Sequence, residues 1–449
     1  MTAALTSPVA VGRRPGPPGG GPAPARTAGG GPGVATPTGR ALPGWPVALP
    51  LVLAPLWWVV GASLLVWIAT AAVGAVLLAT RRDVVAPRVG VLLWAAYVVW
   101  CLLSVVQVHD GSRLVGFALR WLMIISAGIS LVYVVNTSRE QLPLVRVLRW
   151  LAVYWCLVVV GGFLGLLAPR VRTETLLHAA LPASLASNDF TDVLFSLNTA
   201  EASNTASGVY YRPSAPFPYT NAWGSVFALL VPCMLALLCL ERRPRVRLVL
   251  CASILLGLVP AFFTLNRMMF LSLGVGLVYA GLRFAARGRV RALLAVVSSF
   301  VVVGLLSLVI PVVQLISDRV GGSETNQARA GLYQEAILRV AQSPWIGFGT
   351  PLPSERAYQT SVGTQGQVWA VLFSHGYPGV ALFVGFFLWA WWATRACPST
   401  AEVWLHVVTL VALVQIWVYG FENQNMALFV VVVALALRER RRAPGGVRS

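Results

Sequence analysis

The chain has 449 residues, of which 57% are apolar and only 11% are charged. Soluble domains carry about 25% charged residues, so this composition excludes an ordinary soluble protein and indicates an integral membrane protein. The net charge of +19 comes from arginines spread through short loops rather than gathered on one face, which excludes a nucleic-acid-binding protein.

The first 44 residues are rich in Pro, Gly, Ala and Thr, and they contain no apolar core. Such a segment buries too little apolar surface to fold, so residues 1–44 are predicted to be a disordered cytoplasmic tail and not a signal peptide. At the other end, residues 438–449 are predicted to be a second, basic cytoplasmic tail.

Between the tails, residues 45–437 are predicted to form one all-α domain, a polytopic transmembrane bundle. A helix needs about 20 apolar residues to cross a membrane, and on that basis we expect about twelve helices. They are expected at 46–61, 63–80, 89–107, 114–134, 148–168, 221–240, 247–264, 267–283, 291–314, 367–392, 403–419 and 423–437.

The arginines give this bundle an orientation. One set of loops, together with both termini, holds 24 arginines and five acidic residues, whereas the remainder holds ten of each. Because cytoplasmic loops are enriched in arginine and lysine, the side that carries the whole +19 is predicted to be cytoplasmic. We therefore expect a multi-pass protein of a bacterial inner or plasma membrane, with both termini in the cytoplasm.

Two of the predicted external loops are long, at about 169–220 and 315–366, and long loops of mixed composition are usually functional. In the second loop, Leu332, Tyr333, Ala336, Ile337 and Val340 recur at helical spacing. This pattern predicts an amphipathic helix lying at the membrane surface over the bundle.

Four arginines of the predicted external side and membrane are candidates for a functional role: Arg120, Arg212, Arg267 and Arg329. A planar guanidinium pairs bidentately with phosphate oxygens, so these arginines together indicate a site for a lipid-linked phosphate. Each also has an ordinary explanation, because arginines snorkel to lipid headgroups or pair with surface acids. Arg120 lies well inside its helix, where a charge usually faces a protein interior or a wet cavity.

Few other residues could carry chemistry. His375 lies within the apolar helix 367–392, and it is either a satisfied polar group of the bundle or a functional one. The acids are scattered and form neither a DxD motif nor a cluster with histidine. The chain also lacks the GK[ST] sequence that a phosphate-binding loop requires. We therefore expect no metal and no nucleotide cofactor.

Four segments, in order, resemble motifs of the O-antigen ligase and O-antigen polymerase superfamily of bacterial membrane glycosyltransferases. They are RPSAPFPYTNAWG with Arg212 and Asn221, TLNRMMF with Arg267, ARAGLYQEAILRVAQSPWIGFG with Arg329 and Tyr333, and GTQGQVWAVLFSHGYPG with Gln365 and His375. The resemblance covers about residues 46–437. The chain departs from the family pattern by having Ala215 for Gly, Asn266 for Ser, Tyr333 for Trp and Gln365 for the family's His.

The resemblance implies a polyprenyl-diphosphate-linked glycan as donor and a glycan or lipid as acceptor, with membrane lipids and polysaccharide-assembly proteins as further partners. Arg212, Arg267 and Arg329 would hold the diphosphate, and Arg120, Asn221 and Tyr333 are the remaining substrate-binding candidates. Transfer would invert the anomeric carbon without a metal. Glutamine takes up no proton at neutral pH, so where a base is needed it would be a group such as His375 or Glu355.

Two other functions remain open. A non-catalytic lipid-linked glycan transporter or accessory subunit fits the loss of the family's histidine. A solute transporter would require paired charges at the bilayer midplane and repeated broken helices, and the apolar runs carry few charges.

Overall fold

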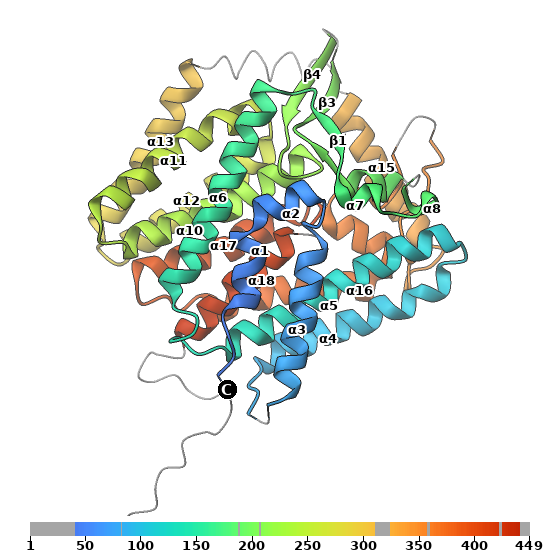
Figure 1. Ribbon diagram of the computed structural model, residues 1–449, viewed down its shortest axis with the longest axis horizontal. Helices are drawn as coiled ribbons and strands as arrows, with labels where there is room; N and C mark the ends of the chain where they lie inside the picture. Colours follow the sequence, from blue (N-terminus) through green and yellow to red (C-terminus); the bar gives the residue numbers. More distant parts are fainter. Residues whose placement is uncertain are drawn as a thin grey trace, which may run out of the picture. The chain divides into compact units, whose positions relative to one another are not determined.

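Helices formed by the apolar runs make up most of the structure (Figure 1). This computed structural model describes residues 41–81, 83–186, 189–205, 208–309, 324–356, 360–421 and 424–440. Within those ranges, 7 helical segments are long and apolar enough to cross a membrane, which indicates a membrane protein. They are α4 with the 3-10 turn η1 (Arg88–Gln107), α5 (Gly111–Asn136), α6 (Leu144–Leu167), α10 (Thr220–Leu240), α11 (Pro244–Phe263), α12 (Arg267–Ala285) and α16 (Gln367–Thr394).

The expected count of about twelve spans is not confirmed, because the described parts of the other apolar helices do not qualify as spans by length and composition. They are α1 (Trp45–Val52), α2 (Ala54–Val60), α3 (Leu65–Ala79), α13 (Val290–Val309), α17 (Thr400–Gln415) and α18 (Gln424–Arg440). The end of the helix predicted at 291–314 lies outside the described residues. The single helix predicted at 46–61 is two helices that meet at Leu53, since Pro55 has no N–H with which to continue α1.

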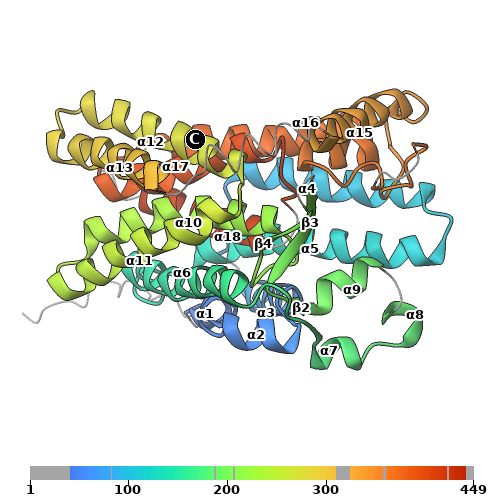
Figure 2. The same ribbon diagram turned by 90° about the horizontal axis from the view of Figure 1, so that it is seen from above.

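Helix α10 is the most buried of the seven membrane-length helices, since 78% of its most apolar 18-residue stretch is buried. It therefore lies at the centre of the bundle. It packs against α6, α17 and α18. Figure 2 shows α1–α3 on one side of α10 and α18, and α12, α16 and α17 on the other. Polar groups also join these helices. The Ser225 hydroxyl donates to Gln415 Oε1 over 2.7 Å, and Gln415 Nε2 donates to the Ser272 hydroxyl over 3.1 Å. Hydrogen bonds of this kind fix helix positions where water is scarce.

The first long loop has a structure of its own between α6 and α10. It holds α7 (Leu176–Ala179), α8 (Ala183–Ala186), α9 (Asp189–Phe195) and the strands β1 (Arg172–Glu174), β2 (Ser196–Asn198), β3 (Ala200–Thr205) and β4 (Gly208–Pro213). Strand β1 pairs antiparallel with β2, and β3 pairs antiparallel with β4. The all-α prediction did not include these strands, because each has at most six residues and lies outside the apolar runs.

The helix predicted in the second long loop is present as α15 (Glu324–Val340), and it packs against α16. Leu332, Ala336 and Val340 are buried as the periodicity predicted, and Leu332 and Ala336 form a small core with Val362 and Phe373. Ile337 departs from the predicted stripe, since its side chain is 46% exposed.

Arginines at the end of α12 and in the turn after it hold the loop that joins α16 to α17. Arg283 donates to the Arg395 carbonyl over 2.6 Å, Arg289 donates to the Pro398 carbonyl over 2.6 Å, and Arg287 donates to the Cys397 carbonyl. Thus several arginines that the sequence analysis assigned to membrane orientation also stabilise a loop.

The last residues of the predicted N-terminal tail belong to the folded bundle. Residues 41–44, predicted to belong to the disordered tail, pack on the bundle: Leu42 is buried, and the Pro43 carbonyl accepts a hydrogen bond from the Tyr133 hydroxyl. Residues 1–40 and 441–449 lie outside the described residues.

Candidate functional site

Two of the arginine candidates lie within electrostatic range of the same buried hydroxyl, that of Tyr419. This residue follows α17, is 2% exposed, and donates a hydrogen bond to Asn266 Oδ1. Burial raises the pKa of Tyr419, and the positive charges of Arg212 and Arg329 partly oppose that rise. Strand β4 and helix α15 thus each place one arginine within electrostatic range of this hydroxyl.

The turn between α11 and α12 connects Arg212 with Arg267. Arg212 is 5% exposed, and its Nε donates to the Thr264 carbonyl over 2.8 Å. Leu265 follows in the left-handed region with a φ of 51°, which is unusual for a branched residue and makes the turn sharp. Arg267 then begins α12 with an exposed side chain. Arg212 therefore supports the turn, whereas Arg267 projects from it.

Asn266 lies between these arginines and packs against the start of α10. Its amide donates to the Thr220 carbonyl over 3.4 Å, next to Asn221, which is half-buried. A Cβ on Gly224 would come within 2.2 Å of Asn266 Nδ2, so only glycine permits this approach. The predicted Asn221 thus lies beside the turn that carries Arg267.

A carboxylate also belongs to this region. Glu201 of β3 is paired in register with Arg212 of β4, and its Oε2 accepts a hydrogen bond of 2.9 Å from the Thr220 amide at the start of α10. An acid is favourable at a helix N-terminus. Sequence reasoning counted Glu201 among the scattered acids and did not identify Tyr419. No local pattern signals either residue, since the fold alone brings them to the arginines.

An aromatic pair lies at the start of α16. The rings of Tyr333 and Trp369 stack with centroids 4.9 Å apart, and Trp369 Nε1 donates to the Trp417 carbonyl over 3.0 Å. Burial raises the pKa of Tyr333, and Arg329, one turn earlier on α15, opposes that rise. Gln365 is half-buried just before Gly366, the residue that precedes α16. Tyr333 of α15 therefore stacks on Trp369, and Gln365 is the neighbour of Gly366, whose backbone lies against the Trp369 ring.

Helix α16 is interrupted in its middle at Gly376, where φ is 67° and ψ is −171°. Pro378 follows, and proline donates no backbone hydrogen bond. The segment 344–350 occupies the break: the amides of Phe348 and Gly349 donate to the Phe373 and Ser374 carbonyls over 2.9 Å each, and the Pro344 carbonyl accepts from Tyr377 over 2.9 Å. The break is therefore closed by the chain's own backbone.

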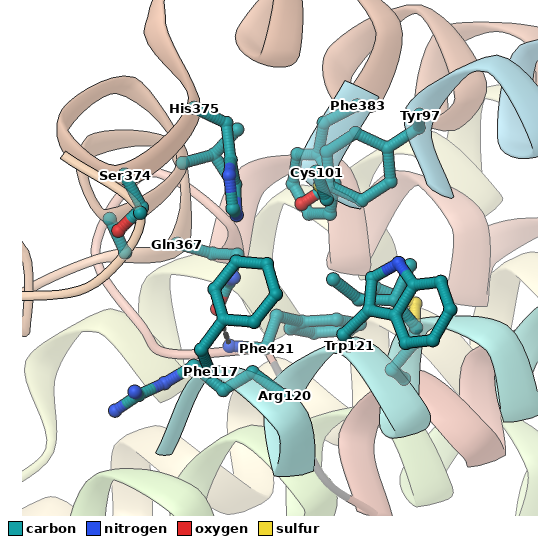
Figure 3. A pocket seen from close by; sticks show the side chains of 15 residues that line it. Tyr97, Cys101, Phe117, Arg120, Trp121, Gln367, Ser374, His375, Phe383 and Phe421 are labelled. Carbon is teal, nitrogen blue, oxygen red and sulfur yellow. Dashed lines mark hydrogen bonds between the residues drawn. The ribbon is translucent and has the colours of Figure 1, made fainter. Parts of the chain in front are cut away.

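A cavity lies beside the break and is lined by two of the polar candidates, Arg120 and His375 (Figure 3). Its space amounts to about 550 Å³, part of it open to solvent, and the lining includes Arg120, Gln367 and His375. In Figure 3, His375 of α16 and Arg120 of α5 lie above and below Gln367. Five aromatic residues also line it: Tyr97, Phe117, Trp121, Phe383 and Phe421.

Hydrogen bonds fix the polar side chains of this cavity. His375 Nδ1 lies 3.0 Å from the Ser104 hydroxyl. The side-chain oxygen Oε1 of Gln367 accepts from the Phe421 backbone amide over 2.6 Å, and the backbone amide of Gln367 donates to the Tyr419 carbonyl over 2.8 Å. Gln367 thus connects the cavity with the segment that carries Tyr419, and sequence reasoning did not single it out.

Glu355 is placed apart from the arginines around Tyr419. It is exposed, its carboxylate lies 3.8 Å from Arg339 Nε, and its amide donates to Glu335 Oε1 over 3.0 Å. Six residues turn an α-helix by about 240° beyond a full turn, so Arg339 and Tyr333 face different sides of α15. Of the two base candidates, only His375 lines the cavity.

Comparison with known proteins assigns neither a family nor a function to this chain. No family model matches the chain, and no curated protein matches its sequence.

Proposed function

We propose that this chain is a multi-pass glycosyltransferase of a bacterial inner or plasma membrane that acts in cell-envelope or extracellular polysaccharide biosynthesis. As a ligase or polymerase, it transfers a glycan from a polyprenyl-diphosphate-linked donor to a glycan or lipid acceptor. The reaction takes place on the external face, and both termini lie in the cytoplasm, as the distribution of arginines favours.

One observation carries this proposal: Arg212 and Arg329 both lie within electrostatic range of the Tyr419 hydroxyl, and Arg267 projects from the turn to which Arg212 is bound. Three cations gathered from separate loops suit a diphosphate, whose oxygens pair with planar guanidinium groups. The resemblance of the sequence motifs to those of O-antigen ligases supports the same reading.

The proposed reaction is a single displacement. An acceptor hydroxyl attacks the anomeric carbon, the bond to the diphosphate oxygen breaks with inversion, and the diphosphate leaves with the electron pair. The arginines stabilise the charge that grows on the leaving group, which is the largest contribution a fixed site usually makes. The hydroxyl proton passes to a base or to water. His375 is the candidate that lines a cavity, whereas Gln365 supplies only an amide.

The test uses the purified full-length protein and a lipid-linked glycan. An enzyme releases polyprenyl diphosphate in proportion to glycan transferred. If no polyprenyl diphosphate appears while the glycan is translocated, the proposal that the protein is a glycosyltransferase is wrong.

That second outcome would favour the alternative, a non-catalytic lipid-linked glycan transporter or accessory subunit. The interrupted helix α16 is the observation in its favour, because discontinuous helices form substrate sites in transporters. Against it, the groups freed at the break are already bound by residues 344–350.

Ligase and polymerase are separated by the glycans of a deletion strain. Long chains stranded on the lipid carrier would indicate a ligase, and single repeat units would indicate a polymerase.

A further inference from the structure

We infer that the stacked pair Tyr333–Trp369, with the Gln365 amide beside it, is the subsite that holds the sugar ring attached to the diphosphate. This inference rests on the proposed function. It adds Trp369 to the candidate residues Tyr333 and Gln365 and assigns the sugar to them. The ligand is a pyranose or furanose ring carried next to a phosphate.

The first argument is the chemistry of the surface. An aromatic face carries partial negative charge, and it attracts the slightly positive C–H groups on the apolar face of a sugar. Tyr333 and Trp369 are both half-buried, so neither residue is closed off from the surface. Gln365 and the exposed Thr364 offer an amide and a hydroxyl to the sugar's own hydroxyls. A flat apolar surface with neutral polar groups at its edge fits a sugar better than it fits a charged group.

The second argument is position. Tyr333 lies one helical turn after Arg329, and the charge of Arg329 acts on both Tyr333 and Tyr419. A sugar on the aromatic pair would therefore be covalently joined to a diphosphate within reach of the arginines.

The third argument is rigidity. The Trp369 indole is held by its hydrogen bond of 3.0 Å to the Trp417 carbonyl. A Cβ on Gly366 would lie 2.6 Å from that same carbonyl, and glycine adopts the required φ of 74°. The α16 entry is thus built to bring Trp369 against residue 417. Ordered side chains lose little entropy when a ligand binds, so a rigid aromatic surface favours recognition.

The experiment compares two probes on the purified full-length protein: farnesyl diphosphate, which has no sugar, and the lipid-linked glycan fraction extracted from the source cells. For the native protein, we expect the glycan-bearing lipid to bind at least about tenfold more tightly, as one stacked sugar ring and its hydrogen bonds would provide. In Tyr333→Ala and Trp369→Ala, this preference should fall about fivefold or more, while farnesyl diphosphate binds as before.

Conservative and distant variants keep the result interpretable. Tyr333→Phe retains the ring and should retain the preference. Trp392→Ala removes a tryptophan that is 57% exposed near the far end of α16, and it should change neither affinity. Thermal unfolding identifies any variant that fails to fold, and Gln365→Ala, a half-buried residue outside the helices, then provides the same comparison with a smaller expected loss.

The outcomes separate the two proposals. If Tyr333→Ala and Gln365→Ala leave the preference for the glycan-bearing lipid unchanged, the sugar subsite is not here, although the proposed function stands. If the native protein binds neither probe, the proposed function fails and the subsite fails with it.

Discussion

Arg212 and Arg267 differ in their surroundings, and this difference determines what each can contribute. Arg212 is buried and bound to the Thr264 carbonyl, so its removal would leave a buried acceptor without its donor. Such a loss costs about 1–3 kcal/mol of stability. Arg267 is exposed, so its side chain is available to a ligand at little structural cost.

We predict that Arg267→Ala lowers the rate of polyprenyl diphosphate release by about 100-fold or more, as is usual when a group that stabilises the leaving charge is lost. Its unfolding temperature should stay within a degree or two of the native value, since exposed positions contribute little. Release assays and thermal unfolding of the same preparation measure both effects. Arg242→Ala, at an exposed arginine after α10, is the matched control. Native activity in Arg267→Ala would remove this residue from the diphosphate site.

Arg212→Ala should lose both activity and stability, by about 1–3 kcal/mol for the latter. Chemical unfolding of Arg212→Ala beside Arg267→Ala measures the difference between the two sites. Equal stability of the two variants would contradict the supporting role of Arg212 in the turn.

Among the elements, helix α16 is interrupted directly after His375, one of the residues that line the cavity. The interruption depends on glycine, because Gly376 has a positive φ and lies against the backbone of residues 344 and 345.

We predict that Gly376→Ala destabilises the protein by about 2 kcal/mol or more, because a Cβ would lie 2.4 Å from the Pro344 and Trp345 carbonyl oxygens at a strained φ. Gly385→Ala in the same helix is the control, since its Cβ would meet its nearest neighbour at an ordinary 3.9 Å. Thermal unfolding in detergent compares the two variants. If they are equally stable, the break does not require glycine.

Helix α15 is joined to the loop after it through the buried carboxylate of Glu335. Burial alone would raise the pKa of Glu335, but hydrogen bonds from the Ser354 hydroxyl, the Glu355 amide and Arg339 outweigh it, so the pKa lies below its ordinary value of 4.5. The carboxylate accepts from Ser354 over 2.6 Å and from the Glu355 amide over 3.0 Å.

A lowered pKa in the folded state means that this anchor contributes fully above the ordinary value and is lost as the pH falls through the folded value. We predict that amide exchange at Glu355 accelerates below about pH 4.5, after correction for the intrinsic rate. In Glu335→Gln the exchange should be fast at neutral pH and show no such transition. A transition that persists in that variant would show that another group anchors the loop.

For the whole molecule, orientation in the membrane follows from charge and not from packing. The arginines at the end of α12 and in the turn after it hold the loop between α16 and α17 in the folded protein, but those contacts are the same whichever way the bundle faces.

We predict that a single cysteine at Thr364 reacts with a membrane-impermeant maleimide in intact cells, whereas one at Ala286 reacts only after the cells are opened. Both positions are exposed, and the native cysteines are replaced first. The reason is the arginine excess around Ala286, which favours the cytoplasm. The reverse labelling pattern would invert the orientation and place the arginines around Tyr419 in the cytoplasm.

The sequence by itself determined the long helices, because about 20 consecutive apolar residues have few alternatives to a membrane-length helix. Helices α10, α11 and α12 begin and end within a few residues of their predicted bounds. The helical spacing of Leu332, Ala336 and Val340 likewise identified α15 and its buried face. The motifs also identified Arg212, Arg267 and Arg329 as candidates.

Only the tertiary structure decided which of these residues are neighbours. The β3–β4 hairpin pairs Glu201 with Arg212. Tyr419 is near these arginines only through contacts between segments far apart in the chain, and such contacts leave no periodic pattern in a sequence. The break in α16 is similar, since Gly376 and Pro378 permit it, while residues 344–350 supply the hydrogen bonds that stabilise it. Local sequence thus determined which segments are helical, and long-range packing determined where the candidate site lies, because its side chains come from several separate segments.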